Sequence, residues 1–139
     1  MSKQRLILDD EYDFLSFGLS CHWKDYRVAW LMNRSLNKDF RREVLQIPGK
    51  NGGLDEFTKF VYKDGDAHLN YVLLSNHNEE TFLLKGHKQY DFFMLIEGYI
   101  DIFDADSFLE SLQAIEGIQF VAPLDNADFK RIQYSLFED

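Results

Sequence analysis

The sequence predicts an α+β protein in which two amphipathic helices cover one face of a mostly antiparallel sheet. Residues 1–139 have the size of a single domain, and 45% of them are hydrophobic, which is enough for a packed core and argues against disorder. Several short segments carry apolar side chains at every second position, which is the period of a strand. Two longer segments carry apolar residues three and four positions apart without internal glycine or proline, as helices do.

The first strand and the first helix follow from the spacing of their apolar residues. Residues 14–21, FLSFGLSC, alternate apolar side chains with serine and glycine, which predicts a half-buried strand. Residues 24–37 predict a helix that starts near Asp25 and ends near Asn37. The stripe expected to face the sheet consists of Tyr26, Ala29, Trp30, Asn33 and Leu36.

The middle of the chain is predicted to be a meander of strands. Asp64 and Gly65 form a typical hairpin turn between two of these strands. A polar run, NHNEE, separates the last two. Strands are expected at residues 40–47, 56–63, 68–76 and 81–84.

The last third of the chain contains a strand and the second helix. Residues 90–98, YDFFMLIEG, are an apolar run of strand length. Residues 104–117 predict a helix with Asp104 or Asp106 at its N-cap and Gly117 in the left-handed conformation at its end. Two more strands are expected, at residues 118–123 and 131–137.

In this order of elements, both helices are expected to pack on one face of the sheet, because the apolar side of each helix must be buried against it. The arrangement resembles the ferredoxin-like or ACT-like plan with extra central strands. Such a plan is shared by proteins of many functions and does not specify one.

The charge and the cysteine content narrow the choice of partner and compartment. A net charge of −9 repels phosphate backbones, so no nucleic-acid partner is expected. The basic residues nearest one another are expected to form a solvated face rather than an RNA site; they are Arg34, Lys38, Arg41 and Arg42. The single cysteine, Cys21, suits a reducing cytosol. No signal peptide or membrane-spanning run is recognised, so we expect a cytoplasmic protein without a membrane partner.

Each reactive group also has a structural interpretation. Cys21 and His22 are adjacent, but neighbours on a strand point to opposite faces, so Cys21 is expected to be a small buried hydrophobe. His68 and His77 form either a metal site or, as their spacing favours, two exposed turn residues. No cofactor is predicted, because the glycines lack the spacing of a phosphate loop. The acidic run of Asp9, Asp10, Glu11 and Asp13 is expected to be a solvated edge.

Residues 83–98, LLKGHKQYDFFMLIEG, lie within an order of features that resembles the IPExxxVDY family of small Bacteroidota proteins. The other shared features are the acidic LDDEYDF, the segment GLSCHWKDYRVAWLMN and the C-terminal SLF. We align Lys85, Gly86 and His87 with Ile-Pro-Glu, and Tyr90, Asp91 and Phe92 with Val-Asp-Tyr. The resemblance implies no particular activity, since the family has none established.

Two roles are open for this signature stretch. In the first, it is a turn that leads into the core strand, with Asp91 accepting backbone N–H bonds from the GHKQ turn. In the second, Asp91 reaches a ligand or a partner at the edge of the sheet. The exchange of proline for glycine and of tyrosine for phenylalanine favours the structural role.

The leading functional hypothesis is a non-enzymatic binding or regulatory module for a protein partner or a small ligand. A free edge of the sheet could also pair two copies into a homodimer. The alternative is a small enzyme that uses Asp91 and His87, or Cys21, for acid–base or nucleophilic chemistry. That alternative requires these groups to converge in a pocket.

Overall fold

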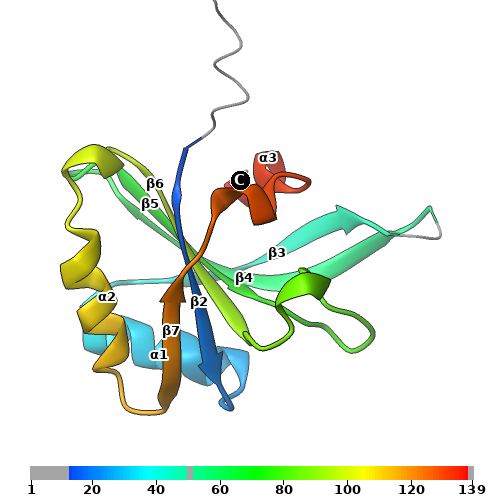
Figure 1. Cartoon of the computed structure of the whole chain (residues 1–139), viewed down its shortest axis with the longest axis horizontal. Coiled ribbons are helices and arrows are strands. Elements are labelled where there is room, and N and C mark those ends of the chain that lie inside the picture. The colour runs from blue at the N-terminus through cyan, green and yellow to red at the C-terminus, as the bar shows by residue number, and fades with distance from the viewer. Residues whose placement is uncertain (1–12, 50–51, 138–139) are drawn as a thin grey trace, which may run out of the picture.

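The computed structural model describes residues 13–49 and 52–137, and these form one antiparallel sheet with helices on both faces (Figure 1). The strand order of this six-stranded sheet is β3-β4-β5-β6-β2-β7. The strands are β2 (Leu15–Cys21), β3 (Arg41–Pro48), β4 (Leu54–Asp64), β5 (Leu69–Ser75), β6 (Phe92–Gly98) and β7 (Ile118–Pro123). The helices are α1 (Asp25–Leu36), α2 (Ala105–Gln113) and α3 (Gln133–Leu136), with 3₁₀ turns η2 (Lys85–His87), η3 (Ile100–Ile102) and η4 (Asn126–Phe129). The predicted α+β class is confirmed.

Two strand–helix–strand units explain the strand order. Every pair of neighbouring strands is antiparallel, so β2 runs parallel to β3 and β6 runs parallel to β7. Helix α1 connects the first parallel pair, and α2 connects the second. Strands β4 and β5 lie between β6 and β3, and they are the extra central strands of the predicted plan.

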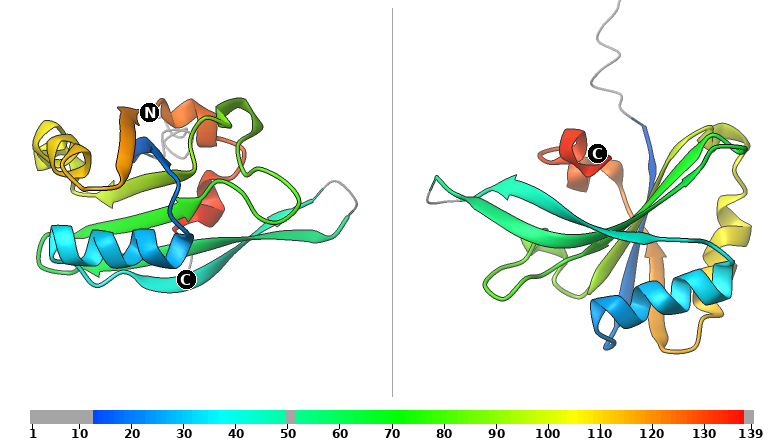
Figure 2. Two further views of the ribbon diagram at one scale, coloured as in Figure 1. Left: turned by 90° about the horizontal axis from the view of Figure 1, so that it is seen from below. Right: turned by 180° about the vertical axis from the view of Figure 1, so that it is seen from behind.

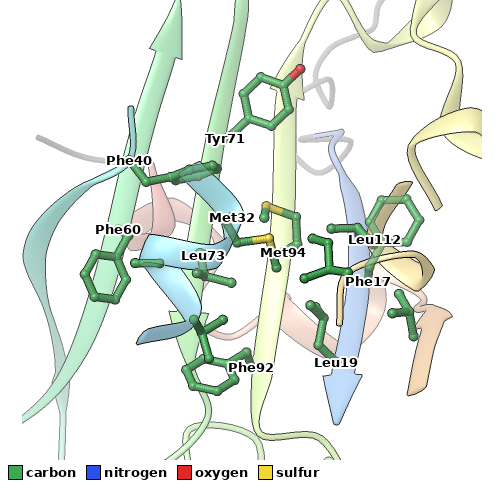
Figure 3. Packing of buried hydrophobic residues seen from close by; sticks show 14 of the residues in the cluster. Phe17, Leu19, Met32, Phe40, Phe60, Tyr71, Leu73, Phe92, Met94 and Leu112 are labelled. Atoms are coloured by element: carbon green, nitrogen blue, oxygen red, sulfur yellow. The ribbon is translucent and has the colours of Figure 1, made fainter. Parts of the chain in front are cut away.

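The sheet has a hydrophobic core on each face. On the first face, α1 and α2 both cover one hydrophobic core, as predicted, and they lie at separate places along that face (Figure 2). There Met32 of α1 and Leu112 of α2 meet the β-strand residues Phe17, Leu19 and Met94 (Figure 3). This packing removes large apolar side chains from water, which is the main stabilising contribution to such a fold.

The opposite face carries the second core, formed with the C-terminal segment. Phe93 and Leu95 of β6 pack there against Phe129 of η4 and Leu136 of α3. Because both faces of β6 are covered, its residues 92–96 are all at most 3% exposed. Double coverage explains why this strand is a continuous apolar run instead of an alternating one.

The predicted buried stripe of α1 is wrong at Tyr26 and Trp30 and right at Ala29. Val28, Ala29 and Met32 are buried, whereas Tyr26 is 69% exposed and Trp30 is 53% exposed. With 3.6 residues per turn, Tyr26 and Trp30 lie on the side of the helix opposite Met32. The helix is apolar on both sides, so its periodicity alone could not identify the side that faces the sheet.

Two of the four predicted helix ends are confirmed, and two are wrong. Asn37 ends α1 in the left-handed conformation, with φ of 56°. Asp25 is not the N-cap of α1, because Lys24 holds that position and Asp25 is the first helical residue. The side chain of Asp104 caps α2 by accepting the N–H of Ser107. Gly117 has the predicted left-handed φ of 98°, but it does not end α2: the helix ends at Gln113, with Ala114 as its C-cap, and Gly117 lies in the turn that leads into β7.

Two predicted strands are absent from the part of the chain that the structure describes. Residues 81–84 make a single bridge, between His77 and Phe82, and are otherwise a loop. Residues 131–137 form a turn and α3, with Ile132 and Leu136 on its buried side. Such short apolar runs do not distinguish a strand from one turn of helix. The other predicted strands are confirmed with small changes at their ends.

Candidate functional site

The loop of residues 76–91, between β5 and β6, contains the signature turn and is organised by the buried side chain of Asn76. The amide nitrogen of Asn76 donates to the carbonyl oxygens of His87, at 3.0 Å, and of Tyr90, at 2.8 Å. Its Oδ1 accepts the N–H of Leu84 at 2.8 Å. Asn76 has no exposed surface. Sequence reasoning missed this residue, although an asparagine directly after an apolar strand is a common local hydrogen-bonding signal.

Asp91 accepts a backbone N–H, as the structural interpretation predicted, but the donor differs from the predicted one. Its Oδ2 accepts the backbone N–H of Cys21 at 2.8 Å, so the carboxylate binds the end of β2 and not the GHKQ turn. The backbone N–H of Asp91 donates to the carbonyl of Leu19 at 2.8 Å, and its carbonyl accepts the N–H of Asn76 at 2.9 Å. Asp91 therefore joins β2 to the loop.

Tyr90 lies across β2 at Gly18, where the strand has no side chain. A Cβ atom at Gly18 would be 2.6 Å from the Tyr90 ring. On β7, Phe120 stacks parallel to this ring, with centroids 6.3 Å apart. Tyr90 is 7% exposed and Phe92 is 3% exposed, so both signature aromatics belong to the core.

The other part of the signature turn, Lys85, Gly86 and His87, lies at the wall of a cleft of about 750 Å³. The β3–β4 hairpin and the C-terminal segment form the rest of the wall. Apolar and charged side chains are mixed in the lining; among them are Leu54, Phe57, Phe82, Lys85, Asp128 and Arg131. The structure therefore separates the signature into a buried half and a half that faces a cleft.

His87 is paired with Asp128 at this cleft. The distance between His87 Nε2 and Asp128 Oδ2 is 2.9 Å, and the His87 side chain is 23% exposed. His87 Nδ1 is buried and has no hydrogen-bond partner among the described residues. Asp128 is therefore the partner of Nε2, and Nδ1 is turned into the protein. The pair thus connects η2 to η4.

Cys21 is a buried residue of the first core, as predicted, and His22 is exposed. Burial raises the pKa of the Cys21 thiol above its ordinary value of 9.0, and the charge of Asp91 raises it further, against a lowering by the hydrogen bond with the Trp23 backbone. A raised pKa disfavours the thiolate, which is the nucleophilic form. The polar contacts of these groups lead elsewhere: Asp91 contacts the Cys21 backbone, whereas His87 contacts Asp128.

The dependence of stability on pH in the alkaline range tests whether the Cys21 thiol is buried. Burial, followed by the charges of Asp64 and Tyr62, also raises the pKa of Tyr71 above 10.0. As the pH rises past 9.0, the unfolded thiol loses its proton before the folded one does, so the free energy of unfolding falls. We expect a shallower fall in Cys21→Ala and Tyr71→Phe, measured by urea unfolding from about pH 8 to about pH 11. An equally steep fall in the double variant would contradict the assignment.

The remaining candidate ligands lie apart. His68 packs against Tyr99, with ring centroids 4.7 Å apart, and His77 packs against Phe82. Within residues 13–49 and 52–137, no three His, Cys, Asp or Glu side chains are grouped as a metal site. Asp13 accepts a hydrogen bond from Asn126 at 3.2 Å. The other acidic residues of that run, Asp9, Asp10 and Glu11, lie outside the described residues.

No protein-family model and no curated protein matches this chain. The resemblance to the IPExxxVDY family thus stays a prediction, and its register needs a correction. That signature has three residues between its two triplets, whereas only Lys88 and Gln89 separate His87 from Tyr90. In the strict register Leu84, Lys85 and Gly86 take the Ile-Pro-Glu positions, so His87 is not the replacement of the glutamate. Separately, no helix in the described part of the chain is long and apolar enough to span a membrane.

Proposed function

We propose that the protein is a cytoplasmic binding module whose cleft beside η2 takes an amphipathic small molecule. The cleft volume of about 750 Å³ carries this proposal, since ligand sites typically measure about 300–1,000 Å³. Leu54, Phe57 and Phe82 offer apolar contact, and Asp55, Glu80 and Arg131 bring charges of both signs. The lining is more charged than that of a typical small-molecule site, which favours a ligand that has both an apolar and a charged part.

Binding is favoured over catalysis because the reactive groups already hold the fold. Asp91 binds the backbone of Cys21, and Cys21 is buried with a raised pKa. The enzyme alternative now rests on His87 and Asp128, whose 2.9 Å contact is that of an imidazole oriented by a carboxylate. The shielded Nδ1 of His87 argues against this alternative. Homodimer formation through an outer strand stays a separate prediction.

A substitution that fills the cleft tests the proposal. A Cβ atom added at Gly86 meets nothing within 4 Å, so Gly86→Phe should fold normally and place a ring at the cleft wall. Gly65, in the turn between β4 and β5, is equally open, and Gly65→Phe is the matched control. Both variants and the original protein would be screened by thermal shift against amphipathic carboxylates, sulfonates and amines.

The expected result is a set of compounds that stabilise the original protein and Gly65→Phe but not Gly86→Phe. A ligand present at 100 times its Kd adds about 2.7 kcal/mol, which raises Tm by several degrees. Compounds that stabilise all three proteins equally would place binding outside the cleft, and the absence of any stabilising compound would overturn the proposal. Consumption of a bound compound, followed by mass spectrometry, would favour the enzyme alternative.

A further inference from the structure

The solvent side of α1 carries aromatic and cationic residues that the packing of the sheet does not use. This Trp–Arg face is composed of Trp23, Tyr26, Arg27, Trp30 and Arg34. The three aromatic residues are 38%, 69% and 53% exposed, in chain order. Spacings of three and four residues align Tyr26, Arg27, Trp30 and Arg34 along one side of the helix, opposite the buried Met32, and Trp23 lies just before the helix begins.

Two arginines hold the tryptophan rings in place. The Cζ atom of Arg27 is 4.1 Å from the ring centroid of Trp23, and that of Arg34 is 5.3 Å from the centroid of Trp30. Trp23 also packs against Gly117, where any added side chain would overlap its indole. Stacked pairs of this kind lose little side-chain freedom when a partner binds, so the face is already ordered for contact.

The face lies in the basic part of an otherwise acidic protein. Residues 23–42 carry six basic and two acidic side chains, a net charge of +4. The other residues carry nine basic and 22 acidic side chains, a net charge of −13. This separation of charge favours an acidic partner at α1 and repels it elsewhere.

We propose that the Trp–Arg face binds an acidic segment of a partner protein that also bears an apolar anchor residue. When an arginine stacks on an aromatic ring, the N–H groups at the edge of its guanidinium still point outward and can donate hydrogen bonds to a carboxylate. Tyr26 and Trp30 supply the apolar surface for the anchor. Tryptophan, tyrosine and arginine are also the residues that most often dominate binding energy at protein interfaces.

Single-stranded RNA is the weaker candidate for the same surface. The arginines already cover one face of each tryptophan, which leaves fewer platforms for stacking bases. Nearby cations are also engaged within the protein. Lys38 lies 4.9 Å from the ring centroid of Tyr71, and Arg41 pairs with Asp39 at 2.9 Å.

A selection from a random displayed peptide library tests the proposal with the intact protein as bait. The chain contains two tryptophans, Trp23 and Trp30, so intrinsic fluorescence reports directly on this face. Enriched peptides would be titrated against the original protein, Trp30→Ala and Arg34→Glu. The controls are Ile102→Ala, at a residue 84% exposed near α2, and Lys130→Glu, an exposed charge reversal beside η4.

We expect the enriched peptides to be acidic and to contain a large apolar residue. Their binding should shift tryptophan emission. They should bind Trp30→Ala and Arg34→Glu about tenfold more weakly than the original protein. Both controls should bind like the original protein. Basic or neutral consensus peptides, or equal binding by all variants, would overturn the proposal. Tighter binding of a polyuridine strand than of any peptide, or an emission shift from protein concentration alone, would also overturn it in favour of RNA or a second copy.

Discussion

Asn76→Ala is expected to lower the free energy of unfolding by about 3–5 kcal/mol. The side chain satisfies the N–H of Leu84 and the carbonyls of His87 and Tyr90, all inside the protein. Each buried group left without a partner costs about 1–3 kcal/mol, although partial collapse of the loop reduces the sum. Urea unfolding followed by circular dichroism measures the loss.

Two further variants test whether the loss of stability is specific to the hydrogen bonds of Asn76 or would follow from replacing another asparagine of the same loop. Asn76→Asp keeps the acceptor for Leu84 but replaces the donor with an oxygen facing the carbonyls of His87 and Tyr90, so it should destabilise the protein at least as much. Asn78 caps its own turn by accepting the N–H groups of Glu80 and Thr81 in a more exposed position. Asn78→Ala should cost only about 1 kcal/mol. Equal losses at the two positions would contradict the central role of Asn76.

Gly18→Ala is expected to cost about 1–3 kcal/mol because the new methyl group would overlap the Tyr90 ring. The overlap cannot be relieved easily. The ring atoms nearest the methyl are the base of the ring, Cγ at 2.6 Å, and Phe93 and Phe120 pack around the same ring. Gly65→Ala, where a methyl meets nothing within 4 Å, is the control and should be close to neutral.

A double-mutant cycle shows whether the contact itself causes the loss. Tyr90→Ala alone should cost about 3–5 kcal/mol, since it empties a buried aromatic site. In the double variant the methyl of Gly18→Ala no longer meets a ring, so the combined loss should be smaller than the sum by about 0.5–3 kcal/mol. Strictly additive losses would mean that strand β2 tolerates no side chain at Gly18 for another reason.

The sequence predicted the elements whose pattern is strong and local. Residues 90–98 and 104–117 were recognised as strand and helix because their apolar residues and caps are close together in the chain. Residues 131–137 were predicted as a strand because a single helical turn has no periodicity that differs from a short apolar run. For the site, Lys85, Gly86 and His87 were singled out as a signature turn and lie at the cleft, whereas Asp128 and Arg131, which also line it, were not singled out.

The sequence by itself determined the α+β class, the two main helices and the buried nature of Cys21, because composition and periodicity report directly on local burial. Only the tertiary structure decided which side of α1 faces water, since Met32 and Trp30 are equally apolar and only the position of the sheet distinguishes them. The tertiary structure also decided the hydrogen-bond partners of Asn76, Asp91 and His87. A hydrogen bond between residues far apart in the chain depends on how strands pair, and no spacing within one segment records that pairing.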